Sequence, residues 1–230
     1  MICLLFLLSP LYSFFIPPQD WSIADPKLFA PSVQACFVGK NKKGFSPSVN
    51  LAVEKIDTSL NEYLKIVKQL HESDRDNRWR DLGNLQTRAG QTRLTEIDTK
   101  TEWGQIRMLQ SILIKDGHAY ILTAAALKEE FSDFYEDFEK AIRSFTITEN
   151  LSSAISQIKK REKLKQHLET LKKSWESSSD ISLEPEAHFL EKNFQKKHWI
   201  PFQQCILNDF KDMGPFWQAL ILQSVRDELD

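Results

Sequence analysis

Cysteine is scarce in this sequence. Its 230 residues include three cysteines, at positions 3, 36 and 205, and no two of them form a Cys-x-x-Cys pair. This scarcity disfavours a disulfide scaffold and a structural zinc finger, and it leaves at most one bridge, between Cys36 and Cys205. An excess of basic residues is also absent, since 30 lysines and arginines stand against 32 aspartates and glutamates. We therefore predict no nucleic-acid partner.

Sequence motifs of catalysis and of phosphate binding are missing as well. There is no Gly-x-Ser-x-Gly motif, no Gly-x-Gly-x-x-Gly motif, no P-loop, and no His-x-x-x-His pair among the five histidines. Cys205 follows His198 by seven residues, but Pro201 interrupts the helical register between them. We predict no catalytic, cofactor-binding or metal-binding residue, no cofactor, and a protein that is not an enzyme. A hydrolase with a site dispersed over loops is the minor alternative.

Long hydrophobic runs are confined to the first sixteen residues. Ile2–Leu8 and Leu11–Ile16 are apolar, but Pro10 separates them, and neither approaches the roughly 20 residues that span a bilayer. The segment resembles the hydrophobic region of a secretory signal, with Ser13 as the small residue before cleavage, although no basic residue precedes it. We predict that residues 1–16 direct export and are the only part of the chain to contact a membrane. An apolar N-terminal segment within a cytosolic fold is the alternative.

Glycine and proline divide the rest of the chain into two regions. Six of the seven glycines lie between residues 39 and 117, and no proline occurs between Pro47 and Pro185. Residues 17–146 contain alternating and β-branched segments, which predict strands and turns. Residues 147–230 are rich in lysine, glutamate and leucine with a helical period. The boundary between two predicted modules therefore lies near residue 147.

The first module has the pattern of an α+β domain. Ser59 and Glu62 form a capping box that opens a helix, and Asp116-Gly117 predicts a two-residue turn between two long strands. The expected elements follow the order β-β-α-β-β-β-β-α. We predict an antiparallel sheet packed with helices, followed by a C-terminal helical module. The strands are expected at 33–39, 49–56, 79–87, 92–98, 105–115 and 118–124, and the second helix at 127–145.

These residues also carry a family resemblance. A Pro-Pro-x-x-Trp opening at Pro17–Trp21 precedes two strands, and the domain closes with Tyr-Ile-Leu-Thr-Ala at Tyr120–Ala124 and Ile-Arg-Ser-Phe at Ile142–Phe145. Residues 17–146 resemble the PsbP-like α/β/α sandwich. This superfamily includes accessory subunits of the photosynthetic oxygen-evolving complex, envelope lipoproteins of the DcrB kind and Ran-binding import factors. The resemblance implies a non-catalytic domain that docks onto partners, and it transfers no partner-binding residue to this chain.

The C-terminal module, residues 147–230, is predicted to form a hairpin or three helices. Its aromatic residues exceed what a lone hairpin can bury, so we expect a candidate partner surface, which also allows self-association. Its members are Trp199, Phe202, Phe210 and Trp217.

Two charged segments are candidates for docking, each with a plain solvated helix face as the alternative. The acidic one is represented by Glu130, Asp133 and Asp137, and the basic one by Lys159, Lys160 and Lys163. Together these features favour an exported or envelope-associated accessory protein that binds a protein partner through either module. A cytosolic adaptor similar to secretion chaperones is the alternative.

Overall fold

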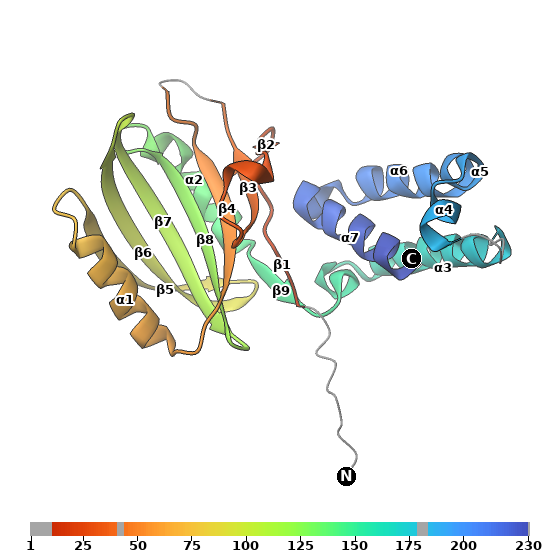
Figure 1. The fold of residues 1–230 in the computed structure, drawn as a ribbon, viewed down its shortest axis with the longest axis horizontal. Coiled ribbons are helices and arrows are strands. Elements are labelled where there is room, and N and C mark those ends of the chain that lie inside the picture. The colour runs from red at the N-terminus through yellow and green to blue at the C-terminus, as the bar shows by residue number, and fades with distance from the viewer. Residues whose placement is uncertain (1–10, 41–43, 179–183, 230) are drawn as a thin grey trace, which may run out of the picture. The chain divides into compact units, whose positions relative to one another are not determined.

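The computed structural model describes residues 11–40, 44–178 and 184–229. They form two compact units, which are an α/β/α sandwich at Phe15–Thr146 and a helical unit made of the described parts of Met1–Phe14 and Ile147–Asp230. Figure 1 shows the sheet with its two helices in the first unit and the helices of the second unit. The antiparallel sheet with packed helices confirms the fold class predicted from the sequence.

A single seven-stranded sheet forms the middle layer of the sandwich. Its order is β2-β3-β4-β8-β7-β6-β5, and every neighbouring pair is antiparallel. The strands are β2 (Ser22–Ile23), β3 (Val33–Val38), β4 (Ser48–Lys55), β5 (Arg78–Thr87), β6 (Gly90–Thr101), β7 (Gly104–Lys115) and β8 (His118–Leu127). A short 3₁₀ turn, η1 (Pro26–Leu28), links β2 to β3.

Two helices cover the sheet on opposite faces (Figure 1). Helix α1 (Leu60–Glu72) packs Leu60 and Leu64 against a buried cluster that includes Ile121 of β8. The next side chain along β8, Tyr120, points to the other face because successive strand residues alternate. There its ring lies 6.3 Å from Phe145, which directly follows helix α2 (Phe131–Arg143) and its C-cap.

Local sequence signals explain where most of these elements begin and end. The Ser59 side chain accepts a hydrogen bond from the Glu62 backbone N–H, and the Glu62 carboxylate accepts one from the Ser59 backbone, as the predicted capping box requires. Asp116 and Gly117 both have positive φ angles, 49° and 72°, which the tight turn between β7 and β8 needs. The second helix is shorter than expected, because Leu127 pairs with Ile106 as the last residue of β8.

The start of the described chain is part of the fold. Strand β1 (Tyr12–Phe14) pairs with β9 (Thr146–Thr148) in a small two-stranded sheet. Phe14 and Phe15 are completely buried, and Phe15 packs edge-on against Phe37 of β3 at 5.7 Å. Ser13, where the sequence predicts cleavage, is itself buried in β1. A cut after Ser13 would divide this strand, so cleavage there stays a prediction that would remove part of β1. Met1–Pro10 lie outside the described residues.

The helical unit combines two long helices with shorter helical elements. They are η2 (Leu151–Ala154), α3 (Ile158–Ser178), α4 (Pro185–Phe189), α5 (Lys192–Phe194), the π-helical η3 (Gln195–Trp199), α6 (Ile200–Asp209), η4 (Lys211–Met213) and α7 (Gly214–Leu229). The Tyr12 hydroxyl of β1 lies 3.0 Å from the Ser224 hydroxyl of α7, so the start of the chain belongs to this unit. Among the described residues, no helix is both long and apolar enough to cross a bilayer.

Candidate functional site

A groove runs beside α2 on the sandwich. Its volume is about 530 Å³, and its walls combine apolar and charged side chains. Leu82 of β5 and Tyr135 of α2 are about half exposed at its rim, with 46% and 49% of their surface accessible. The remaining lining residues are Leu94, Glu96, Arg107, Leu109, Lys128, Phe131 and Ser132. Apolar side chains left accessible around a concavity are typical of a site that receives another molecule.

The local backbone explains why Leu82 is exposed. Strand β5 is the edge of the sheet, and its register with β6 shifts between Asp81 and Gly83. Gly83 has a φ of 93°, and its N–H donates to the Asp81 carboxylate at 2.9 Å. This bulge turns the strand edge and leaves Leu82 directed to the surface.

A network of ion pairs lies along one wall of the groove. The Arg107 guanidinium makes a two-pronged contact with Asp98, at 2.7 Å and 2.9 Å, and Lys128 reaches the same carboxylate at 2.9 Å. Glu96 pairs with Arg80 and lies 3.6 Å from Arg107. Three cationic side chains thus face two anionic ones, which leaves this wall with one positive charge.

The network holds Asp98 in its ionised form. Hydrogen bonds from Arg107 and then from Lys128 lower the pKa of the Asp98 carboxyl to about 2, although burial opposes the shift. The same pairing raises the pKa of Arg107. Asp98 therefore stays ionised at physiological pH, and its pairing fixes the Arg107 side chain, whose guanidinium carbon lies 5.8 Å from the centre of the Phe131 ring.

The acidic residues predicted for docking lie on or just before α2. Asp133 is exposed and Asp137 is half-buried, whereas Glu130 is buried at the position that precedes the helix. Ser132 and Tyr135 of the same helix line the groove. The structure thus brings the predicted acidic helix to the groove. Sequence reasoning did not anticipate this, because β5 and β6, which complete the groove, are distant from α2 in sequence.

The four aromatic residues predicted as a partner surface are buried inside the helical unit. Trp217 and Phe210 are fully buried with their rings 5.6 Å apart, and the indole N–H of Trp217 donates to the Leu151 carbonyl at 3.0 Å. Trp199 and Phe202 are 6% and 5% exposed, and their rings also pack together. The expectation of an exposed surface is corrected here, because α3, α6 and α7 enclose more apolar surface than a hairpin could.

The basic residues predicted for docking are partly neutralised. Lys163 pairs with Asp209 at 2.8 Å, and Lys160 pairs with Asp212 at 2.6 Å. Lys159 is exposed. Two of these three lysines therefore tie α3 to the segment around the end of α6, which is a role within the unit.

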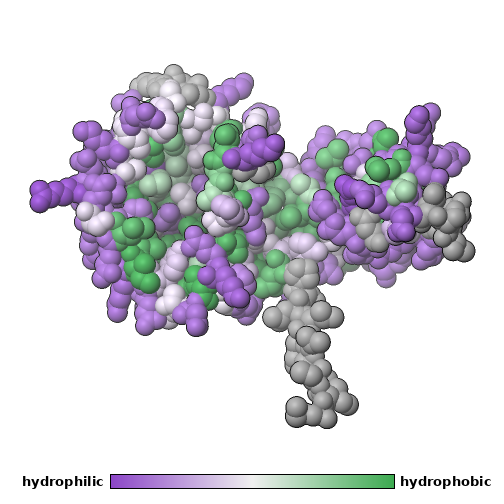
Figure 2. All heavy atoms as spheres, in the orientation of Figure 1, coloured by the Kyte–Doolittle hydropathy of each residue, from purple (hydrophilic) through white to green (hydrophobic). Residues whose placement is uncertain are grey.

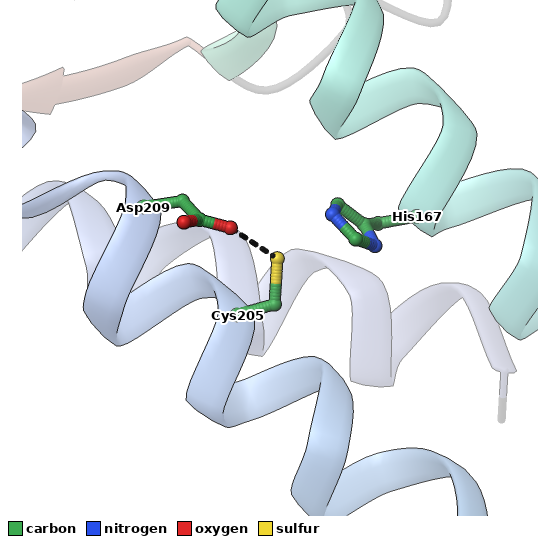
Figure 3. A group of neighbouring side chains, drawn as sticks. All are labelled: His167, Cys205 and Asp209. Atoms are coloured by element: carbon green, nitrogen blue, oxygen red, sulfur yellow. Dashed lines mark hydrogen bonds between the residues drawn. The ribbon is translucent and has the colours of Figure 1, made fainter.

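Three side chains with metal-ligating atoms meet between α3 and α6. They are His167 of α3 and Cys205 and Asp209 of α6, and their ligand atoms lie within 4.8 Å of one another. The Cys205 thiol donates to the Asp209 carboxylate at 3.2 Å, and Figure 3 shows His167 facing that sulfur from the other helix. The sequence placed Cys205 beside His198 only. Its spacing of four from Asp209 was a readable signal, whereas the approach of His167 depends on how the helices pack.

The cluster lacks the electrostatics of a thiol nucleophile. Burial, together with the hydrogen bond to the Asp209 carboxylate, raises the pKa of the Cys205 thiol to about 12. A catalytic cysteine instead needs a lowered pKa so that the thiolate is present near pH 7. Cys36 is likewise a free, buried cysteine, and burial raises its pKa to about 11. Neither thiol is activated for attack.

Comparison with known proteins gives matches by structure alone. No family model and no curated protein matches this sequence. Cyanobacterial PsbP (CyanoP) of Synechocystis sp. PCC 6803 is 13% identical, and the match covers 64% of this chain and 98% of that one with a TM-score of 0.43. LpqN, a protein involved in cell envelope biogenesis in Mycobacterium tuberculosis, is 13% identical. The match covers 61% of this chain and 86% of LpqN, with a TM-score of 0.45.

A third match is the Ran-binding protein Mog1p of Saccharomyces cerevisiae. It is 14% identical, and the match covers 58% of this chain and 88% of Mog1p with a TM-score of 0.41.

Proposed function

We propose that this protein is a non-enzymatic accessory protein that binds a protein partner through the groove beside α2. The observation that supports the proposal is the pairing of exposed apolar side chains, Leu82 and Tyr135, with a fixed network of charges in one concavity. Protein interfaces commonly place aromatic and arginine side chains at their centre with polar groups around them. Asp133 and Asp137 on the adjacent helix are proposed to contribute to docking of a partner with basic groups.

The remaining predicted docking residues are the lysines of α3 and the four aromatic residues of the helical unit, and only one of them is proposed to contact a partner directly. Lys159, which is exposed on α3, is proposed as a secondary contact for an acidic group of the partner. Lys160 and Lys163 would have to leave Asp212 and Asp209 before they could contact a partner. The four buried aromatic residues would act only through the stability of the helical unit.

A matched pair of variants tests the groove. Leu82→Glu places a charge at its rim, and Ile66→Glu makes the same type of change on α1, where Ile66 is 58% exposed. Figure 2 shows apolar surface exposed over α1, so this helix is a fair control surface. Both substitutions should change the free energy of unfolding by less than about 0.5 kcal/mol, because neither site is buried.

The readout is quantitative capture of partners by the full chain. Proteins enriched by the wild type should be lost with Leu82→Glu and retained with Ile66→Glu. Equal retention by both variants would exclude the groove as the binding surface, and equal loss would point to a non-specific effect of added charge.

We further propose that the protein is exported, on the basis of the apolar residues at its N-terminus. Since Phe14 is buried, the cleavage that accompanies export should occur before Tyr12. The cytosolic adaptor remains the second candidate, favoured by the packing of β1 into the fold. Sequencing the N-terminus of the protein isolated from cells separates the two, because a start between residues 9 and 12 supports export and a start at Met1 supports the adaptor.

A further inference from the structure

We propose that the helical unit binds a divalent metal ion of the zinc class through His167, Cys205 and Asp209. This inference concerns a site in a different unit from the groove, and it does not depend on the proposed protein-binding function. Its basis is that two neighbouring helices bring one nitrogen, one sulfur and one oxygen ligand together, as Figure 3 shows.

The donor set selects the class of ion. Zinc is bound by thiolate, imidazole and carboxylate groups, whereas magnesium and calcium take oxygen ligands almost exclusively. A thiol among three ligands therefore excludes the hard cations as the preferred occupants. Of the first-row ions, zinc and cobalt accept such a mixed set in tetrahedral geometry.

The spacing of the ligand atoms is close to what a tetrahedral ion requires. Metal–ligand distances of about 2.0–2.3 Å imply ligand atoms about 3.3–3.8 Å apart. The Cys205 sulfur and the Asp209 oxygen already lie 3.2 Å apart, and no pair in the cluster exceeds 4.8 Å. The largest separation therefore has to shorten by about 1 Å for all three atoms to bind one ion.

An unsatisfied polar atom points independently to a ligand. His167 Nε2 is buried and has no hydrogen-bond partner in the described structure. A buried polar atom left without a partner costs free energy, and coordination of a cation would remove that cost. The nitrogen of His167 can therefore accept coordination to a metal ion, an interaction that no side chain of the described structure replaces.

A pocket beside the cluster gives an ion access from solvent. This pocket has a volume of about 230 Å³ and is bordered by His167, Cys205 and His198. The three clustered side chains supply three ligands, and the pocket leaves room for a water molecule as the fourth. Lys163, which pairs with Asp209, is the competing cation, and an ion entering the cluster would replace that pairing on the carboxylate. Binding releases the proton of the Cys205 thiol to solvent, so that a thiolate–metal bond forms.

Cobalt titration of the full chain tests the site. Co²⁺ bound by a thiolate gives a ligand-to-metal charge-transfer absorption that water-coordinated Co²⁺ does not show. All proteins carry Cys3→Ser, so that Cys36 and Cys205 are the only thiols. We expect the band to saturate at one equivalent of Co²⁺ and to disappear when Zn²⁺ is added.

Variants assign the band to the cluster. Cys205→Ser should abolish it, and His167→Gln should weaken Co²⁺ binding by at least tenfold, whereas Cys36→Ala and His71→Gln should leave it unchanged. Because His167→Gln could disturb packing, Asp209→Asn provides a second variant at a half-buried site, and circular dichroism checks the fold of each. Thermal melting adds an independent readout, since Zn²⁺ should raise the melting temperature of the wild type and not of Cys205→Ser.

Two results would overturn the proposal. One is the absence of a thiolate band with the wild type at Co²⁺ concentrations well above that of the protein. The other is a band that persists in Cys205→Ser or is lost in Cys36→Ala, either of which would place the metal elsewhere in the chain.

Discussion

Replacing Trp217 by alanine tests whether this residue belongs to the core of the helical unit or to a partner-binding surface. The side chain is fully buried in α7, stacks near Phe210, and donates its indole N–H to the Leu151 carbonyl. Removing a fully buried tryptophan costs about 3–5 kcal/mol, and leaving a buried carbonyl without its donor adds to that loss. We expect Trp217→Ala to lower the free energy of unfolding of the helical unit by about 4 kcal/mol or more.

The expected loss of unfolding free energy is large enough to measure as a shift in melting temperature. In a domain of 60–100 residues, each kcal/mol shifts the melting temperature by about 4–8 °C, so the variant unit should be unfolded or close to unfolding at 37 °C. Urea denaturation followed by far-UV circular dichroism measures the change. Trp217→Phe separates the two contributions, since it keeps most of the apolar contact and loses only the hydrogen bond, and it should cost less than half as much.

Trp103→Ala is the matched control. Trp103 is 52% exposed, and its removal should change stability by about 1 kcal/mol at most. Sedimentation of each variant reports the mass. If Trp217→Ala kept its stability within about 0.5 kcal/mol and lost self-association or partner binding instead, the packing described here would be refuted, and the sequence-based expectation of an aromatic partner surface would be restored.

Three further perturbations test the sandwich. Asp98→Asn should cost about 2 kcal/mol at pH 7. The pKa of Asp98 is about 2 in the folded state, below its unfolded value of 3.8. The stabilisation from ionised Asp98 is therefore fully present above pH 4 and is lost as the pH falls from 4 to 2. The urea midpoints of variant and wild type should converge over that range. Gly39→Ala would place Cβ 2.8 Å from the Trp21 ring and should lower the free energy of unfolding by about 1–3 kcal/mol. If the same substitution cost no less in a Trp21→Phe background, the clash with Trp21 would not be the cause. Ser59→Ala removes the cap of α1 and should cost about 1 kcal/mol by thermal melting, with no loss indicating that the cap is compensated.

The sheet was predictable because its signals are local. The capping box at Ser59 and the turn at Asp116-Gly117 each depend on two or three neighbouring residues, and both appear where the sequence placed them. The small strands β1, β2 and β9 were missed, since two or three residues carry no periodicity, and their pairing depends on distant partners. Leu127 was assigned to a helix because its apolar character fits either element, and only its pairing with Ile106 decides for the strand.

The candidate sites were less accessible to sequence reasoning. Apolar stripes such as those that contain Trp199 and Trp217 indicate that a helix has a buried face. They do not indicate whether the residues that bury this face belong to the same chain or to another protein. The lining of the groove extends in sequence from Leu82 to Tyr135, and the cluster extends from His167 to Asp209, so neither set of residues forms a local motif. Only packing brings them together.

The sandwich interrupts the helical unit in the order of the chain. Tyr12 precedes the sandwich in the chain, whereas Ser224, whose hydroxyl lies 3.0 Å from that of Tyr12, follows it. Residues 15–146 are therefore synthesised between the two partners of this contact. A nascent chain that ends shortly after residue 146 lacks α7, so the pairing of Tyr12 with Ser224 has to form late in synthesis, after the strands and helices of the sandwich have been made.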